Sequence, residues 1–203
     1  MSNGVDPKVP PLPIFSEKFI AKLHENKSDK ARAEELEHAI DEHNRIHGEE
    51  DPELYERFAE KLEKLLKEYK QNWELLAKEL ETLLEEIKKG RLAENTFGLN
   101  PGSEMPFFGL IKKEVFGVKN ISDLDKKQID LLVQTTKDVL EIVRREVRLI
   151  DFWNNYTAQK KLKAYIISHL LTAFKGNKKI QSNKNALAQQ ILELAFHLNE
   201  QII

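Results

Sequence analysis

KLEKLLKEYKQNWELLAKELETLLEEIKKG, residues 61–90, is the stretch that decides the fold. Its apolar residues recur in alternating steps of four and three, which is the spacing of a coiled-coil-like helical seam. Either one long helix or two helices jointed near Gln71-Asn72 satisfies this pattern, and Gly90 ends it. A seam of this length serves an intramolecular bundle as well as a dimer. The seam residues are Leu62, Leu66, Tyr69, Trp73, Leu76, Leu80, Leu83 and Ile87.

Helical patterns also dominate the rest of the chain, which has neither a run of alternating strands nor an internal repeat. Asp51 and Pro52 mark a further helix start, because aspartate caps free amides and proline suits a first turn. The sequence therefore predicts an all-α fold, an irregular bundle of about seven helices with no sheet. The other helices are expected from Ser16, over Asp29–His47, over Pro106–Gly117, from Ser122 or Asp123 to about Ile150, and over about 155–174 and 183–203.

Proline content and loop length set the expected domain organisation. Residues 1–14 contain four prolines and are expected to form an extended lead-in, because proline blocks helix and strand hydrogen bonding. Residues 15–203 are expected to form a single all-helical domain. The loop near 90–104, rich in glycine, asparagine and proline, is longer than most connections and leaves a subdivision there open.

Composition excludes several classes of protein. The 203 residues include no cysteine, so a disulfide or a thiolate metal site is excluded, and a reducing compartment, the cytoplasm, is expected. The longest apolar stretch, Ala164–Phe174, is about half of what a membrane span needs, so no membrane partner is expected. The start of the chain has no pattern of an export signal.

Charge is divided unevenly along the chain. Residues 25–90 hold 20 acidic residues against 12 lysines and arginines, a balance of −8. Residues 152–192 hold seven lysines and no acidic residue, a balance of +7. This asymmetry predicts that the two regions meet different partners, or each other.

Three short motifs are typical of catalytic sites but lack the groups that such sites need. Asp41-Glu42-His43 looks like the acidic box of an ATP-driven motor, but it lies in a helical pattern and the chain has no phosphate loop. His43 and His47 have helical metal-ligand spacing, but the glutamate of a zinc-protease helix is missing between them. Glu86 and Lys88 spell half of a nuclease motif without its partner aspartate. We therefore expect no catalytic, cofactor-binding or metal-binding residue, and a metallohydrolase built on the two histidines, which would require bound metal, ranks last.

Two aromatic segments are candidates for a protein interface. Phe107 and Phe108 lie in a short helix that is more apolar than an exposed helix usually is, which indicates either ordinary core or a docking surface. Phe152 and Trp153 lie just before the lysine-rich region and have the same two interpretations. We take these four residues as the candidate protein interface.

Lysines after this aromatic segment are the candidate DNA contacts. Aromatic side chains beside lysines can stack on bases and neutralise phosphates. Packing of an amphipathic bundle would also bury the tryptophan and leave lysines in solvent, so this interpretation stays an alternative. The candidate lysines are Lys160, Lys161, Lys163, Lys178, Lys179 and Lys184.

Four segments carry a resemblance to a known family, namely ARAEELEHAIDEHNRIHGEEDPELYERFAEKLEKLL (31–66), NWELLAKELETLLEEI (72–87), LNPGSEMPFFGLIKKEVFG (99–117) and EIVRREVRLIDFWNNYTAQKKLKAYI (141–166). Together they resemble the C-terminal helical region of the restriction (R) subunit of type I restriction-modification enzymes. The most distinctive parts are the EEDPELYE turn and the IDFWNN turn, which follow each other in the family's order, and the resemblance spans about residues 16–175. The stretch from residue 176 on does not align clearly, which leaves its role open.

The resemblance implies an assembly role. In that family the full-length subunit looks like an endonuclease followed by ATP-driven motor domains and then this helical part. The resemblance implies that the helical part docks the subunit onto the modification and specificity subunits. Contact with duplex DNA is the alternative role. ATP and Mg²⁺ would then act in the parent protein, a type I site-specific deoxyribonuclease, and not in this fragment. We expect the chain to be an excised domain, with a naturally short paralogue as the alternative. The sequence does not indicate the DNA recognition site, the oligomeric state or the exact docking surface.

Overall fold

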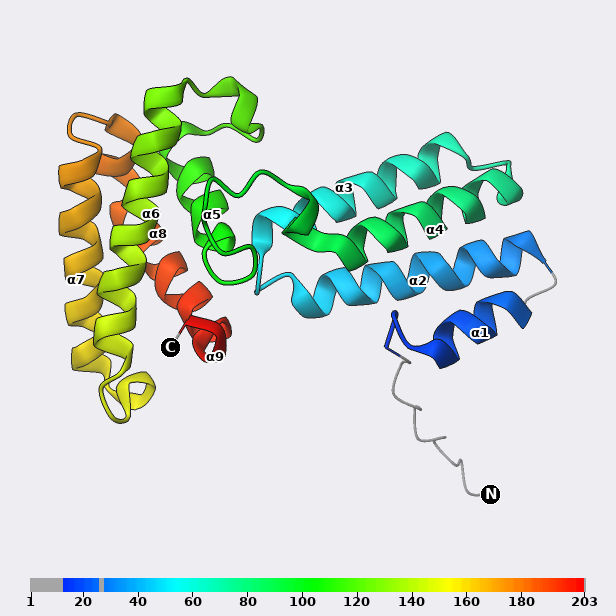
Figure 1. The fold of residues 1–203 in the computed structure, drawn as a ribbon, viewed down its shortest axis with the longest axis horizontal. Helices are drawn as coiled ribbons and strands as arrows, with labels where there is room; N and C mark the ends of the chain where they lie inside the picture. The colour runs from blue at the N-terminus through cyan, green and yellow to red at the C-terminus, as the bar shows by residue number, and fades with distance from the viewer. Residues whose placement is uncertain (1–12, 26–27, 203) are drawn as a thin grey trace, which may run out of the picture. The chain divides into compact units, whose positions relative to one another are not determined.

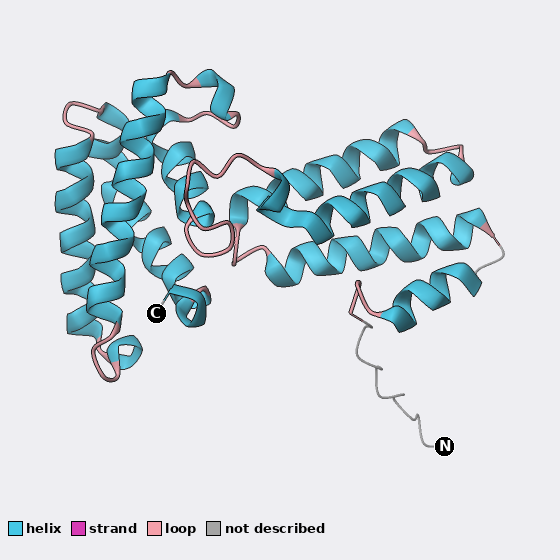
Figure 2. Cartoon of the chain, in the orientation of Figure 1, coloured by secondary structure: helices cyan, strands magenta, loops and turns pink. Residues whose placement is uncertain are grey.

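The structure is a computed structural model that describes residues 13–25 and 28–202 of the chain. All regular secondary structure in these residues is helical (Figures 1 and 2). The all-α prediction is therefore confirmed, with nine α-helices in the described residues instead of about seven. Within this part of the chain, no helix is both long enough and apolar enough to cross a membrane. The expected lead-in, residues 1–14, lies outside the described residues except for Pro13 and Ile14.

The chain forms two compact units. Unit 1 takes the described residues up to His47 together with Tyr55–Gly90, and unit 2 takes Gly48–Leu54 and the described residues from Arg91 on. The expectation of one helical domain over 15–203, with a subdivision near 90–104 left open, stays a prediction beside this division into units. One division falls at Gly90, where the long loop begins, while the assignment of the short segment 48–54 to unit 2 has no signal in the local sequence.

Unit 1 contains α1 (Glu17–Glu25), α2 (Asp29–His47), α3 (Pro52–Glu68, from Tyr55 on) and α4 (Trp73–Lys89), and α2 packs along α4 (Figure 1). Ion pairs join the helices at their edges, from Arg32 to Glu81 at 3.3 Å and from Lys61 to Glu86 at 2.6 Å. The acidic stretch of the sequence is therefore a set of solvated helix faces, where exposed pairs of this kind contribute little to stability.

The predicted seam is the apolar face of α3 and α4. Leu62 and, in α4, Leu80 and Leu83 are buried, whereas Trp73 at the joint is half exposed. Two helices are observed because Asn72 interrupts the seam: its side chain caps α4 by accepting a hydrogen bond from the Leu75 amide at 3.1 Å. The burial of these residues inside unit 1 favours the intramolecular interpretation of the seam.

Unit 2 is built from four long helices and one short one, namely α5 (Met105–Phe116), α6 (Lys126–Val147), α7 (Tyr156–Ala173), α8 (Lys178–His197) and α9 (Asn199–Ile202). The helix α5 packs on α6 and α8, and α7 packs on the same two helices, so the four surround one core. The short 3-10 turn η2 (Ile121–Asp123) connects α5 to α6, and η3 (Phe152–Asn154) connects α6 to α7, while η1 (Gly90–Ala93) lies between α4 and α5.

Two helix starts in unit 2 differ from the prediction. The helix α6 begins after Asp125 instead of Ser122 or Asp123, because Asp125 and Gln128 exchange capping hydrogen bonds of 2.9 Å. The helix α8 begins at Lys178 instead of near residue 183, because the Asn177 side chain accepts from the amides of the next turn, including that of Lys179 at 2.9 Å.

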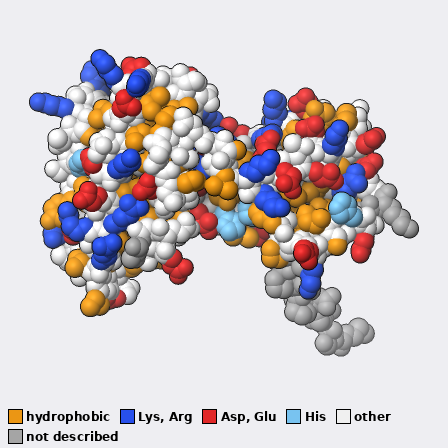
Figure 3. Space-filling view, viewed as in Figure 1, with side chains coloured by type: hydrophobic (Ala, Val, Ile, Leu, Met, Phe, Trp, Pro, Cys, Tyr) orange, Lys and Arg blue, Asp and Glu red, His pale blue; other side chains and the backbone are white. Residues whose placement is uncertain are grey.

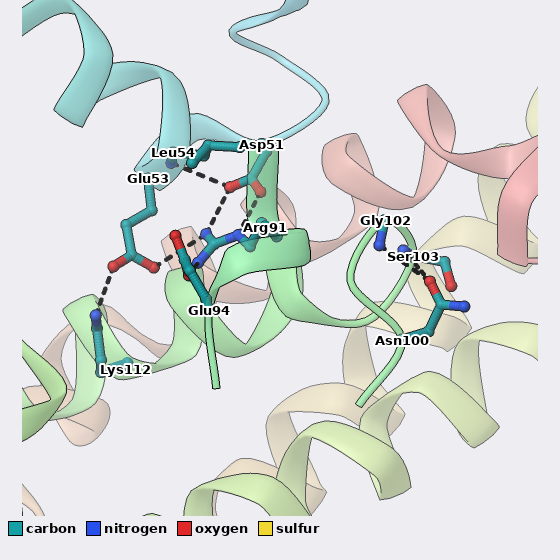
Figure 4. A network of polar contacts seen from close by, with 9 residues as sticks. All are labelled: Asp51, Glu53, Leu54, Arg91, Glu94, Asn100, Gly102, Ser103 and Lys112. Carbon is teal, nitrogen blue, oxygen red and sulfur yellow. Dashed lines mark hydrogen bonds and ion pairs between the residues drawn. The ribbon is translucent and has the colours of Figure 1, made fainter. Parts of the chain in front are cut away.

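A buried network of charges holds the segment 48–54 within unit 2 (Figure 4). The Arg91 guanidinium, in η1, donates to both carboxylate oxygens of Asp51, at 2.7 and 2.8 Å. It also contacts Glu53 at 3.4 Å and Glu94 at 2.9 Å, and Lys112 of α5 donates to the other oxygen of Glu53 at 2.5 Å. These bonds fix the first turn of α3 against η1 and α5, two chain segments that lie about 40 and 60 residues away in sequence.

Asp51 has two roles in this network. As predicted, it caps α3, since its carboxylate accepts from the Leu54 amide at 3.1 Å. Burial alone would lower the pKa of the Arg91 guanidinium, but the hydrogen bond and charge of Asp51, with the charges of Glu53 and Glu94, raise that pKa above its ordinary value. Arg91 therefore stays charged, and the network is a true buried ion cluster.

Candidate functional site

The turn between α6 and α7, residues 148–155, is fixed by local hydrogen bonds. The Leu149 amide donates to the Glu146 carbonyl at 3.2 Å, and the Phe152 amide donates to the Leu149 carbonyl at 3.1 Å. The Asn155 side chain then caps α7 by accepting from the Ala158 amide at 3.0 Å. The turn is therefore a defined structure and presents its side chains in set directions.

Asp151 bends the chain at the apex of this turn. Its φ of 60° lies in the left-handed region, which aspartate adopts more readily than most residues with a side chain. The Asn154 amide group donates to its carboxylate at 2.6 Å and holds the bend. Because of this bend, residues before and after Asp151 face different surroundings.

The two residues directly after the bend face inward. Phe152 is buried, and Trp153 packs edge to face on Phe152 and Phe196 with ring centroids 4.9 and 5.2 Å apart. The Trp153 indole donates to the Asn199 side chain at 3.0 Å, so its polar atom is satisfied inside unit 2. The Gln159 side chain donates to the Trp153 carbonyl at 2.7 Å and ties the turn to α7.

Residues before the bend, and the first residue of α7, face solvent. The Leu149 side chain is 52% exposed, Ile150 is 98% exposed and Tyr156 is 73% exposed. We call these three residues the apolar tip. Isolated exposed apolar residues are ordinary, but two large ones on one ordered turn and a third at the start of the next helix mark a surface suited to binding another molecule.

Positive charge surrounds the apolar tip. Arg145 and Lys161 both lie over the Tyr165 ring and pair with Glu146, at 3.1 and 3.8 Å. The side chains of Arg148 and Lys160, by contrast, are exposed and form no ion pair within the part of the chain that the structure describes. Hydrophobic and basic side chains are seen together at the lower end of this unit (Figure 3).

A comparison with protein families identifies the chain. The model of the family described as "Type I restriction enzyme HindI endonuclease subunit-like, C-terminal" matches residues 4–200, nearly the whole sequence. The chain belongs to this family. The match runs past residue 176, where the resemblance seen in the sequence alone ended, so the last helices are part of the family's domain. Comparisons with curated proteins and with solved structures gave no match.

Three of the four interface candidates in this type I restriction enzyme domain are core residues. Phe107 and Phe108 are buried in α5, which is covered by α6 and α8, and Phe152 is buried below the turn. Their burial favours ordinary core, the alternative that the sequence had left open, and a part in a protein interface stays a prediction. Trp153 is half buried, and its indole is bonded to Asn199 inside unit 2.

The six candidate DNA contacts do not form one patch. Lys160 and Lys161 lie near the start of α7. Lys178 and Lys179 begin α8, close to the far end of α7. At a rise of 1.5 Å per helical residue, the two pairs are about 18 Å apart along the axis of α7. Three of the six lysines also donate hydrogen bonds within the protein. Lys163 donates to the Gln189 side chain at 3.0 Å, Lys179 donates to the Phe116 carbonyl at 3.3 Å, and Lys184 donates to the Gln181 carbonyl at 2.9 Å. DNA contact stays a prediction.

The histidine pair and the acidic motif lie in unit 1. The His43 and His47 rings are 4.4 Å apart and pack with Tyr55 and Phe15 in an aromatic cluster. Glu42 is bound to Arg45 at 2.6 Å, and this hydrogen bond lowers the pKa of the carboxyl group. Among the described residues, no group of three or more histidine, aspartate or glutamate side chains is placed to hold a metal ion.

Proposed function

We propose that this domain docks the endonuclease subunit of a type I restriction enzyme onto the methyltransferase core formed by the modification and specificity subunits. The observation that carries the proposal is the apolar tip, an ordered turn with an isoleucine that is 98% exposed. Such a turn binds a partner with little loss of conformational entropy, because its geometry is already set before binding. We place this complex in the cytoplasm, in keeping with a chain without cysteine.

The chemistry of the enzyme would belong to other parts of the parent subunit. This sequence has no phosphate loop, and the acidic motif at Asp41 lies on a helix whose Glu42 is paired with Arg45. ATP and Mg²⁺ would therefore act in the motor domains, and this domain would contribute binding alone. Restriction would depend on it through assembly, with no reacting group supplied from here.

Size-exclusion chromatography with light scattering tests the docking proposal. The purified chain is run alone and then with the modification and specificity subunits of its own restriction system, in the absence of DNA. Co-elution as a complex of summed mass is expected. Separate elution of the chain and the core at micromolar concentrations, about the level at which a transient protein complex dissociates, would refute the docking role.

DNA binding is the second candidate function, favoured by the exposed lysines Lys160 and Lys178, whose side chains have no partner among the described residues, in a region without acidic residues from 152 to 192. It predicts binding of the chain alone to duplex DNA, with an affinity that falls steeply as salt rises. The double variant Lys178→Glu/Lys179→Glu is expected to abolish such binding. A fluorescence anisotropy titration at two salt concentrations measures both effects.

A further inference from the structure

We infer that the partner receives the apolar tip in an apolar hollow bordered by carboxylates. This inference rests on the docking function proposed above and specifies the chemistry of the partner's surface. It follows from what the tip exposes, which charges beside it are still available, and which charge lies at its apex.

The apolar side chains of the tip require an apolar counterpart. Ile150 projects from the turn with nearly its whole side chain in water, and Leu149 and Tyr156 expose more than half of theirs. A flat polar surface would leave these side chains partly wet, whereas a hollow removes them from water on several sides. The hydrogen bonds at Asp151 and Trp153 hold the turn in place, so a rigid knob is offered to a preformed depression.

Apart from Asp151 at the apex, the charges available beside the tip are positive. Glu146 already neutralises part of the charge of Arg145 and Lys161, which are also held over the Tyr165 ring. Arg148, directly before the tip, and Lys160, one turn after Tyr156, are exposed cations that form no ion pair in the described part of the chain, so a partner can use their full charge. Aspartate or glutamate side chains around the hollow would complement them and speed association.

DNA would be the other ligand for an apolar wedge between basic side chains, because proteins that kink DNA insert such wedges between base steps. Asp151 argues against it. Its carboxylate is exposed at the apex, directly after Ile150, and it accepts a hydrogen bond from the neutral amide group of Asn154. An anion at the point of insertion would face the phosphates on both sides of the groove, whereas a protein hollow can meet it with an amide or hydroxyl donor.

Three variants of the full 203-residue chain separate these contributions. Leu149→Ser/Ile150→Ser removes the aliphatic side chains of the tip, and Arg148→Gln/Lys160→Gln removes the two cations without adding negative charge at the end of α6. The matched control is Leu131→Ser, since Leu131 is also an exposed leucine of α6 but lies about 24 Å along the helix from Val147. Binding to the methyltransferase core and to a 30-base-pair duplex is measured by surface plasmon resonance, and circular dichroism melting verifies the fold of each variant.

The expected results are specific to each variant. The aliphatic double variant binds the core at least about a hundredfold more weakly, as expected for two buried anchor residues. The Arg148→Gln/Lys160→Gln variant associates about tenfold more slowly at low salt, and the difference shrinks as salt rises. The Leu131→Ser control binds as the unmodified chain does.

Other results overturn the inference in distinguishable ways. If the unmodified chain binds the core and the aliphatic double variant binds equally well, the tip is not the contact, while the docking function stands. If the unmodified chain ignores the core and binds the duplex through the same side chains, the ligand is DNA, and both the docking function and the carboxylate-bordered hollow are refuted. If it binds neither, both are refuted as well.

Discussion

Replacing Arg91 by methionine is expected to destabilise unit 2 severely. Arg91 neutralises Asp51 and helps to neutralise Glu53 inside this unit. The side chains of Arg91, Asp51 and Glu53 are only 5%, 8% and 12% exposed, so the two carboxylates cannot regain water unless the segment 48–54 moves. Methionine keeps much of the apolar volume of arginine, so the change tests mainly the charge and its hydrogen bonds.

The size of the effect follows from what remains after the change. Removing one partner of a buried ion pair costs about 3–5 kcal/mol, because the other charge stays buried without compensation. Here Asp51 keeps the hydrogen bond from the Leu54 amide, and Glu53 keeps the ammonium of Lys112. The expected loss lies at the lower end of that range, about 3 kcal/mol from the free energy of unfolding of unit 2.

The two tryptophans allow the units to be followed separately. Trp73 belongs to unit 1 and Trp153 to unit 2, so in a Trp73→Phe background the fluorescence during urea titration reports unit 2 alone. A Trp153→Phe background reports unit 1 in the same way, so each unit gives its own transition and two-state behaviour need not be assumed for the whole chain. The matched control is Arg32→Met in unit 1: Arg32 pairs with Asp29 and Glu81 but is 27% exposed, so its loss is expected to cost less than about 1 kcal/mol.

A second variant identifies the cause. Asp51→Asn combined with Arg91→Met removes both charges, and the double variant is expected to be at least about 1 kcal/mol more stable than the sum of the single losses predicts. A loss below about 1 kcal/mol for Arg91→Met, or strict additivity in the double variant, would refute the reasoning that an orphaned buried charge dominates.

Three further changes follow from the backbone and the caps. A Cβ atom at Gly109 would overlap the Glu53 carboxylate. Gly109→Ala is therefore expected to lower the free energy of unfolding by about 1 kcal/mol, although alanine favours the helix more than glycine does. A variant that proves more stable in urea titration would contradict this. At the left-handed Asp151, valine is expected to cost about 1–2 kcal/mol more than glycine; equal melting temperatures of the two variants would show that the backbone there is not strained. Asp125→Ala removes the capping box with Gln128 and is expected to cost about 1 kcal/mol, with amide exchange of the first turn of α6 increased and the rest of that helix unchanged.

Helix ends could be predicted where a single cap precedes the apolar pattern. Asp51 and Gly90 are such positions, and the structure has a helix start and a helix end there. The start of α6 could not be assigned, because Ser122, Asp123 and Asp125 are all good capping residues. The choice between them depends on the burial of the intervening Leu124, a tertiary contact that the local sequence does not show.

The site was predictable only in part. The segment from Leu149 to Tyr156 is visibly rich in large apolar residues, and Trp153 drew attention to it. The bend at Asp151 determines which of them face inward. A single aspartate in a sequence does not predict a left-handed conformation. The network of Arg91 had no signal at all, since the bonded residues lie 40 positions apart and each also suits an exposed position.

Folding energetics separate the apolar tip from the other aromatic and aliphatic residues of unit 2. Phe107 and Phe152 are buried, so their conformations are explained by the core that they complete, and a substitution there would weaken folding and binding together. Ile150 loses almost no surface when the chain folds, so its apolar side chain adds almost nothing to stability. An exposed isoleucine on a turn held by three side-chain hydrogen bonds is therefore accounted for by a partner more readily than by the fold, and any effect of Ile150→Ser on assembly is an effect on binding alone.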